Sequence, residues 1–433
     1  MNSLLKIKDS YNMYIINQHG VDLETLKFKF TVDTSYGDGL NQLQLPFVLG
    51  QTYNCYVNKG DGSPEIHITT WDQAETLLTW STGTIYQVSI RGEMGGWSYN
   101  DIGDKLKISS LVQWGNVGVD YLAGGFYGCI NMLSIPNTPI TGADNCVTVD
   151  NIFRNCSGLT GSIPAGLFDN CPLIATDGFR NAFNGCLGLT GSIPANLFRY
   201  NTLVGSNGFF AVFSGCSGLT GSIPAGLFDN CPLVSLNGFY QSFNGCSGLT
   251  GSIPVDLFRY NTLVAGLAFQ STFSNCSGLT GSIPVDLFRY NTLAVGFIQT
   301  FINCSGLTGS IPVDLFRYNI NVTSFFRVLR GCTGLTGSIP EDLFYYNVNC
   351  TNYSSALNSC RNLTLPVRLF NLGQLSIVTT FDDFMYSDST LYSFTGTIQD
   401  IWNYALTALH LNAFTNQIAL TNYVAIPNDW KGL

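Results

Sequence analysis

The sequence has little charge. Of its 433 residues only 11% are charged, whereas 45% are hydrophobic and 13% are aromatic. This balance excludes an intrinsically disordered chain, which needs few aromatics and a high net charge. The length leaves room for two or three domains. The formal net charge of -9 argues against nucleic-acid binding, because lysine and arginine must neutralise a phosphate backbone.

Several functional signals are also lacking. No apolar stretch approaches the ~20 residues of a membrane-spanning helix, and the first residues lack the apolar core of a secretory leader, so we expect no export by that route. There are only three histidines and no C-x-x-C pair, which argues against zinc. The G-x-S-x-G, H-E-x-x-H and phosphate-loop motifs are missing. The sequence therefore predicts a protein that is not an enzyme and has no cofactor or bound metal.

A repeat fills the chain after about residue 125. The string LTGSIP occurs seven times, and a cysteine precedes each copy by three residues. Counted from Cys129 to Cys360, these cysteines are spaced by 27, 30, 30, 30, 30, 28, 28 and 28 residues. A fixed period of this length is typical of a solenoid, in which each unit buries its apolar face against its neighbours. Later echoes at 394–398 and 426–430 predict about eleven coils, with an atypical capping end.

One coil illustrates the predicted local structure. Phe269 and Phe273 are four residues apart, which predicts a short helix with both rings on one face. Leu279 and Ile283 flank a short extended piece that pairs with the same piece in neighbouring coils. Pro284 then ends this pairing and starts a second short helix. We therefore predict an α/β solenoid of 26–30-residue coils, each with one short strand and short helices.

The repeated cysteines are expected to be structural. Buried free thiols that pack as small hydrophobic groups are the favoured interpretation, although neighbouring coils lie within disulfide distance. This structural ladder consists of Cys156, Cys186, Cys216, Cys246, Cys276, Cys304, Cys332 and Cys360.

A recurring row of tyrosines with neighbouring arginines is a candidate for ligand binding. Exposed aromatic rings beside arginines suit a carbohydrate or a protein ligand. The alternative is that each tyrosine packs against the next coil and the arginine stems cover the rings. The candidate residues are Tyr200, Tyr260, Tyr290, Tyr318 and Tyr346, with Arg199, Arg259, Arg289 and Arg317. A row of carboxylates, each three residues before an arginine, is interpreted as surface ion pairs, and a row of asparagines as structural hydrogen-bonding groups.

The motif Phe273, Cys276, Leu279 with its exit at Ile283 and Pro284 resembles the BspA-like leucine-rich repeats of bacterial and phage surface proteins. Plant-type leucine-rich repeats share the LTGSIP string but fit the cysteine and phenylalanine positions less well. Residues 40–107 resemble the PKD-like β-sandwich that often precedes such repeats. Here Gly-Asp-Gly-Ser at 60–63 matches its signature, but Lys59 replaces the expected tryptophan.

The resemblance implies binding rather than catalysis. We expect an N-terminal attachment segment (1–39), a PKD-like β domain (40–107), a capping segment that leads into the repeats (108–128) and the leucine-rich repeat solenoid (129–433). Because a virion protein needs no leader, the favoured interpretation is a bacteriophage head fibre, decoration protein or tail adhesin on the virion surface. The alternatives are a bacterial cell-surface adhesin and an intracellular protein-interaction scaffold.

The expected partners follow from the same interpretation. The solenoid would bind a glycan or protein of the host surface, and the N-terminus would bind other virion proteins. We also expect a homo-oligomer, with no nucleic-acid partner and no membrane span.

Overall fold

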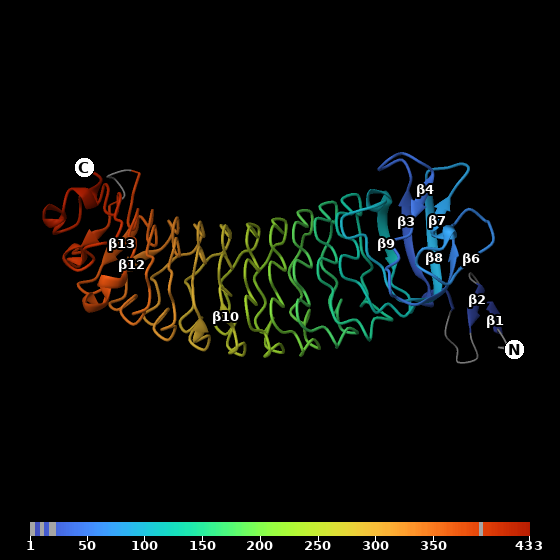
Figure 1. Ribbon diagram of the computed structural model, residues 1–433, viewed down its shortest axis with the longest axis horizontal. Helices are drawn as coiled ribbons and strands as arrows, with labels where there is room; N and C mark the ends of the chain where they lie inside the picture. The colour runs from blue at the N-terminus through green and yellow to red at the C-terminus, as the bar shows by residue number, and fades with distance from the viewer. Residues whose placement is uncertain (1–4, 9–12, 17–22, 389–392) are drawn as a thin grey trace. The chain divides into compact units, whose positions relative to one another are not determined.

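The computed structural model describes residues 5–8, 13–16, 23–388 and 393–433 (Figure 1). The chain divides into two compact units. The first comprises Met1–Ile174, Ala182–Leu189 and Asn196–Asn201, and the second comprises Ala175–Asn181, Thr190–Ala195 and Thr202–Leu433.

The described residues form strands and short 3-10 helices. The strands of the first unit are β1 (Leu5–Lys8), β2 (Met13–Ile16), β3 (Phe28–Asp33), β4 (Gln42–Gln44), β5 (Tyr53–Asn58), β6 (Ile66–Ile68), β7 (Leu77–Thr79), β8 (Ile85–Met94) and β9 (Ile108–Gln113). Those of the second unit are β10 (Ala265–Gly266), β11 (Leu293–Ala294), β12 (Thr336–Ser338), β13 (Asn362–Leu365) and β14 (Thr395–Gly396). The 3-10 helices are η1 (Leu23–Leu26), η2 (Ala74–Thr76), η3 (Lys105–Lys107), η4 (Leu372–Ile377), η6 (Ile401–Asn403), η7 (Tyr423–Ala425) and η8 (Asp429–Lys431).

The first unit contains an antiparallel β domain. Its main sheet has the strand order β6-β5-β8-β3-β9, and β4 pairs with β7 in a second, two-stranded sheet. Buried and half-buried residues alternate along β3, as expected for a strand with one face on the core. The core centres on the fully buried Trp97, whose ring lies 5.0 Å from Phe28 and 5.1 Å from Phe30.

The sheet extends beyond the predicted domain limits of 40–107. Strand β3 falls within the predicted attachment segment, and β9 falls within the predicted capping segment. Both are held in the sheet because β3 pairs with β8 on one side and β9 on the other. Strands β1 and β2 pair with each other, while residues 1–4, 9–12 and 17–22 of the attachment segment lie outside the described residues.

In the second unit the repeats form stacked coils (Figure 1). The N–H of Phe209 donates to the Gly238 oxygen in the next coil at 3.0 Å, and that of Ala211 donates to the Tyr240 oxygen at 2.7 Å. The N–H of Val212 instead donates three residues back, to the Phe209 oxygen at 3.3 Å. Alternate residues thus bond between coils and within a coil, so this stretch is a ribbon of consecutive turns.

This ribbon replaces the predicted helix between the paired phenylalanines. An α-helix would direct every N–H to a carbonyl four residues earlier, but here every second N–H bonds to the next coil. The ribbon turns once per four residues, so Phe269 and Phe273 still lie on one buried face. The prediction of a shared face is confirmed, and the prediction of a helix is wrong.

The second predicted helix, at 285–291, is also a pair of turns. The N–H of Arg289 bonds to the Asp286 oxygen at 3.0 Å, and that of Asn291 bonds to the Phe288 oxygen at 3.1 Å. Asp286 has a φ of 63°, which is incompatible with a right-handed helix. The described coils therefore contain no α-helix, and the α/β description of the solenoid is wrong in this respect.

In several coils the predicted short strand is reduced to a single backbone hydrogen bond to the neighbouring coil. The N–H of Thr250 donates to the Gly221 oxygen at 2.8 Å, and that of Thr280 donates to the Gly251 oxygen at 2.8 Å. Longer parallel pairing occurs only among the last described coils, where β12, β13 and β14 form one sheet. Strand β14 carries the echo of the repeat at 394–398, so the continuation of the pattern is confirmed.

Stacked aromatic rings form the core of the second unit. Phe243 and Phe273 lie 5.7 Å apart at an interplanar angle of 1°, and Phe269 and Phe297 lie 5.6 Å apart at 5°. At the C-terminal end Trp430 is buried and its ring stacks on Phe414 at 6.0 Å. This tryptophan covers the last phenylalanine, as the predicted capping end requires.

Candidate binding surfaces

The predicted tyrosine–arginine row is present in the second unit. The side chains of Tyr260 and Tyr290 are 50% and 41% exposed, and those of Tyr318 and Tyr346 are half-buried. The remaining pair, Tyr200 and Arg199, belongs to the first unit, where the guanidinium carbon lies 4.7 Å from the Tyr200 ring centre.

Each of the row's arginines in the second unit lies over the tyrosine of the next coil. The guanidinium carbon of Arg289 is 4.8 Å from the centre of the Tyr318 ring. The corresponding distance from Arg317 to Tyr346 is 4.7 Å. A cation therefore lies over the Tyr290, Tyr318 and Tyr346 rings, as the structural alternative predicted, while part of each side chain stays exposed.

Aspartates fix the positions of these arginines. Arg289 and Arg317 each approach the aspartate three residues earlier, Asp286 and Asp314, at 3.2 Å. The hydrogen bond to Asp286 raises the pKa of Arg289 above its ordinary value. The prediction that the carboxylates form surface ion pairs with the arginines is confirmed. The result is a line of Asp–Arg–Tyr groups along the coils with both charge signs represented.

The cysteine ladder is buried and hydrogen-bonded. The Cys276 thiol donates to the Phe243 oxygen of the preceding coil at 2.9 Å, and the Cys304 thiol donates to the Phe273 oxygen at 2.9 Å. All fourteen cysteines are buried. Burial raises the pKa of the Cys304 thiol to about 12. These thiols join coils through S–H donors, in addition to packing as small apolar groups.

The asparagine row is also structural. The Asn291 amide donates to the Phe258 and Asn261 oxygens of the preceding coil, at 3.1 and 3.0 Å. Asn319 makes the same two bonds to Phe288 and Asn291, at 3.1 and 3.0 Å. These buried amides satisfy backbone oxygens at the corner of each coil, which confirms their predicted role.

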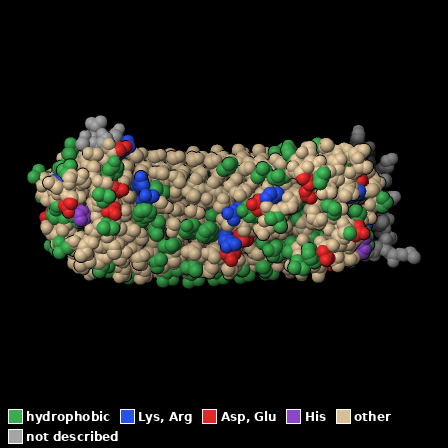
Figure 2. Space-filling model, turned by 45° about the horizontal axis from the view of Figure 1, so that its top comes forward, with side chains coloured by type: hydrophobic (Ala, Val, Ile, Leu, Met, Phe, Trp, Pro, Cys, Tyr) green, Lys and Arg blue, Asp and Glu red, His purple; other side chains and the backbone are tan. Residues whose placement is uncertain are grey.

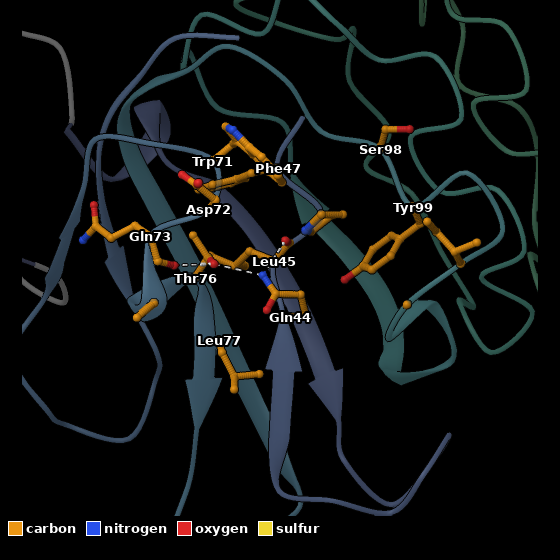
Figure 3. Close-up of a pocket in the computed structure, with 14 residues that line it drawn as sticks. Gln44, Leu45, Phe47, Trp71, Asp72, Gln73, Thr76, Leu77, Ser98 and Tyr99 are labelled. Carbon is orange, nitrogen blue, oxygen red and sulfur yellow. Dashed lines mark hydrogen bonds between the residues drawn. The ribbon is translucent and has the colours of Figure 1, made fainter. Parts of the chain in front are cut away.

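A pocket of about 620 Å³ lies in the β domain, in a region for which the sequence indicated only strands (Figure 3). Its wall combines apolar groups, such as Phe47 and Ile102, with the polar side chains of Asp72 and Tyr99. Trp71 is 39% exposed beside it. The exposed tryptophan before an aspartate, Trp71-Asp72, is the sequence signal by which this site could have been found.

Other site types find no support in the described part of the chain. No group of three or more His, Cys, Asp or Glu side chains there is arranged to hold a metal ion. No helix among the described residues has the length and apolar character needed to cross a membrane.

Comparison with known proteins gives structural matches but no match to a family model or a curated protein. The chain is similar to the Arabidopsis receptor kinase HAESA, solved in complex with the peptide hormone IDA and the co-receptor SERK1, at 18% identity and a TM-score of 0.28 over 69% of this chain. The match covers 52% of the HAESA chain, or about half its length. The description of the fold as a stack of coils and a β domain rests on the pairing and packing described above.

Proposed function

We propose that this chain is a non-enzymatic adhesion protein, a bacteriophage virion component that binds the host surface through its repeat stack. The observation that supports this most is the recurrence of one half-exposed tyrosine, covered on one face by an arginine, in coil after coil of the second unit. Rings of this kind bind the apolar faces of sugars or protein side chains, and the neighbouring Asp–Arg pairs supply hydrogen-bonding groups.

Repetition gives the row its binding strength. A weak contact at one coil is multiplied when the ligand itself repeats, because each further contact is intramolecular. A virion that carries many copies of the chain multiplies the effect again. The proposed ligand is a host-surface glycan or protein, and the N-terminal segment is the proposed attachment to other virion proteins.

The BspA-like and PKD-like resemblances fit the same proposal. Both kinds of unit occur in surface proteins that bind rather than catalyse. Genes for capsid or tail proteins beside this gene would support the virion assignment. Cell-envelope genes would favour a bacterial surface adhesin, and neither kind of neighbour would favour an intracellular scaffold.

Host-surface binding by full-length variants tests the role of the row. We expect the double variant Tyr260→Ala/Tyr290→Ala to bind host cells or their surface polysaccharide several-fold more weakly than the unaltered chain. The matched control is Val285→Ala/Val313→Ala, which removes two exposed apolar side chains, 59% and 69% exposed, from the same repeat stack. Equal binding by the tyrosine variant and the unaltered chain would contradict the proposal.

A further inference from the structure

The pocket in the β domain has the construction of a small-ligand site. Its volume of about 620 Å³ falls within the range of known ligand pockets. The floor is rigid, because the Phe47 ring stacks on Tyr53 at 4.5 Å and the Tyr53 hydroxyl donates to the Gly96 oxygen at 3.0 Å. A ligand would meet a preformed apolar surface here, which limits the conformational entropy lost on binding.

The loop with Trp71 and Asp72 is held in place by a neighbouring side chain. The Gln73 amide oxygen accepts the N–H of Thr69 at 3.0 Å, and its nitrogen donates to the His67 oxygen at 2.9 Å. Trp71 itself keeps 39% of its surface exposed. An indole in a fixed loop at a pocket presents a flat apolar face with little entropy to lose.

Tyr99 provides an independent observation. Its side chain is only 2% exposed, and its ring packs edge-on against Trp97 at 5.8 Å. The hydroxyl has no hydrogen-bond partner among the described residues, and Figure 3 shows it directed toward the pocket. A buried hydroxyl without a partner is destabilising. Because the oxygen is closed off from solvent, a polar group of a bound ligand would satisfy it after the side chains around it shift.

The remaining polar groups specify the ligand further. The amide nitrogen of Gln44 donates hydrogen bonds to the Leu45 oxygen and the Thr76 hydroxyl. Its amide oxygen can therefore accept a hydrogen bond from a ligand. Ser98 donates its hydroxyl to the Ala123 oxygen at 2.6 Å, which leaves it as an acceptor as well. No lysine or arginine lines the pocket, and Asp72 is its one charged side chain. The pocket therefore disfavours anions and favours a neutral ligand rich in hydroxyl donors.

We propose that this pocket binds a neutral pyranose sugar, with one C–H face of the ring on Trp71 and its hydroxyls on Asp72 and Tyr99. A pyranose matches the site because it combines an apolar face with hydroxyl groups along its rim. The inference goes beyond the tyrosine–arginine row, since it places a separate site in the β domain, and it holds whether or not that row binds a ligand.

Binding of free sugars to the full-length protein tests the inference. The probes are methyl glycosides of glucose, galactose, mannose and N-acetylglucosamine, with glucuronic acid and sialic acid as anionic counterparts. Saturation-transfer NMR and calorimetry should show that at least one neutral sugar binds and that the acids bind more weakly. No binding of any neutral sugar at tens of millimolar, or preference for an acid, would overturn the inference.

Variants assign the binding to this pocket. Trp71→Ala should weaken the sugar at least about tenfold while the fold is kept, because the side chain is partly exposed. Tyr99→Phe should weaken it several-fold and yet raise the melting temperature, because it removes an unpartnered buried hydroxyl. A structural tyrosine would show the opposite change in melting temperature.

Two controls separate this site from other parts of the chain. Tyr36→Ala removes a tyrosine that is 44% exposed and does not line the pocket, and it should leave sugar binding unchanged. A loss of free-sugar binding in Tyr260→Ala/Tyr290→Ala that Trp71→Ala does not share would place the sugar on the row and rule out the pocket, so failure of the row and failure of the pocket give different results. Unchanged sugar binding by Trp71→Ala would rule out the pocket.

Discussion

At the residue scale, the turn ribbon depends on left-handed residues at every fourth position. In one coil these are Asn207, Ala211 and Gly215, with φ of 51°, 51° and 77°. Asparagine and glycine tolerate the left-handed region, whereas in alanine the steric clash of Cβ costs about 1–2 kcal/mol. The requirement explains why asparagine and glycine recur on either side of the phenylalanine pairs.

Ala211→Gly should therefore stabilise the protein by about 1 kcal/mol, because glycine adopts a positive φ without steric cost. The control is Ala225→Gly, at an exposed alanine of the same coil whose φ is not positive, where added backbone freedom should lower stability. Chemical denaturation compares the two free energies of unfolding. A loss of stability in both variants would contradict the left-handed assignment.

The buried thiols predict a distinct chemical behaviour. In the native protein at pH 8, almost none of the cysteine thiols should react with a thiol reagent. In the denatured protein, close to all fourteen should react without a reductant. Thiols that stay unreactive after denaturation until reductant is added would show disulfides and contradict the hydrogen-bonded ladder.

The same thiols predict how stability depends on pH. Burial raises the pKa of Cys304 and Cys360 from 9.0 to about 12, so the folded state keeps protons that the unfolded chain loses. Stability should be fully present below pH 9 and should fall as pH rises from about 9 to 12. Denaturant unfolding at pH 8 and pH 10.5 measures the change, and equal stability at both values would contradict it.

At the element scale, each coil is stabilised mainly by contacts with its neighbours. The Phe273 ring stacks on Phe243 at 5.7 Å and on Phe301 at 5.5 Å. The backbone, the thiol and the asparagine amide of a coil bond to adjacent coils as well. One coil alone would leave all of these groups unpaired, which is why the repeat must be long.

Phe273→Ala should lower the free energy of unfolding by about 3–5 kcal/mol, because a cavity opens between two stacked rings. It should also divide the stack into parts that melt separately. Ile283→Ala, at a second buried position, should cost about 2–5 kcal/mol. Val285→Ala, two residues further along and 59% exposed, is the matched control and should change stability little. Calorimetry that shows a single unshifted transition for Phe273→Ala would contradict the core assignment.

The repeat period, the buried rings and the stacking of identical side chains in successive coils were all predictable from the sequence. The spacing of Phe, Cys and Leu follows directly from the length of one coil. The turn ribbon was not, because a spacing of four residues fits both a helix and a turn that repeats every four residues. The domain limits were missed because β3 and β9 join the sheet by pairing that is distant in sequence. The pocket was missed for the same reason, as its walls come from separate loops.

At the scale of the whole molecule, charge is sparse at the surface. On the face shown in Figure 2, acidic and basic side chains occur in small groups among wide uncharged areas. Such a surface offers little long-range electrostatic attraction. Binding would then depend on short-range contacts made many times, as the proposed tyrosine–arginine row and the proposed sugar pocket on every copy would provide.

The most direct test of the proposed adhesion function is a comparison of single and clustered full-length chains on one host-surface polysaccharide. Chains biotinylated at the C-terminus would be measured by biolayer interferometry, alone and as streptavidin tetramers. Weak repeated contacts predict an apparent Kd at least about 100-fold lower for the tetramer. A tetramer that binds no host-surface fraction more tightly than the single chain would contradict the proposed function.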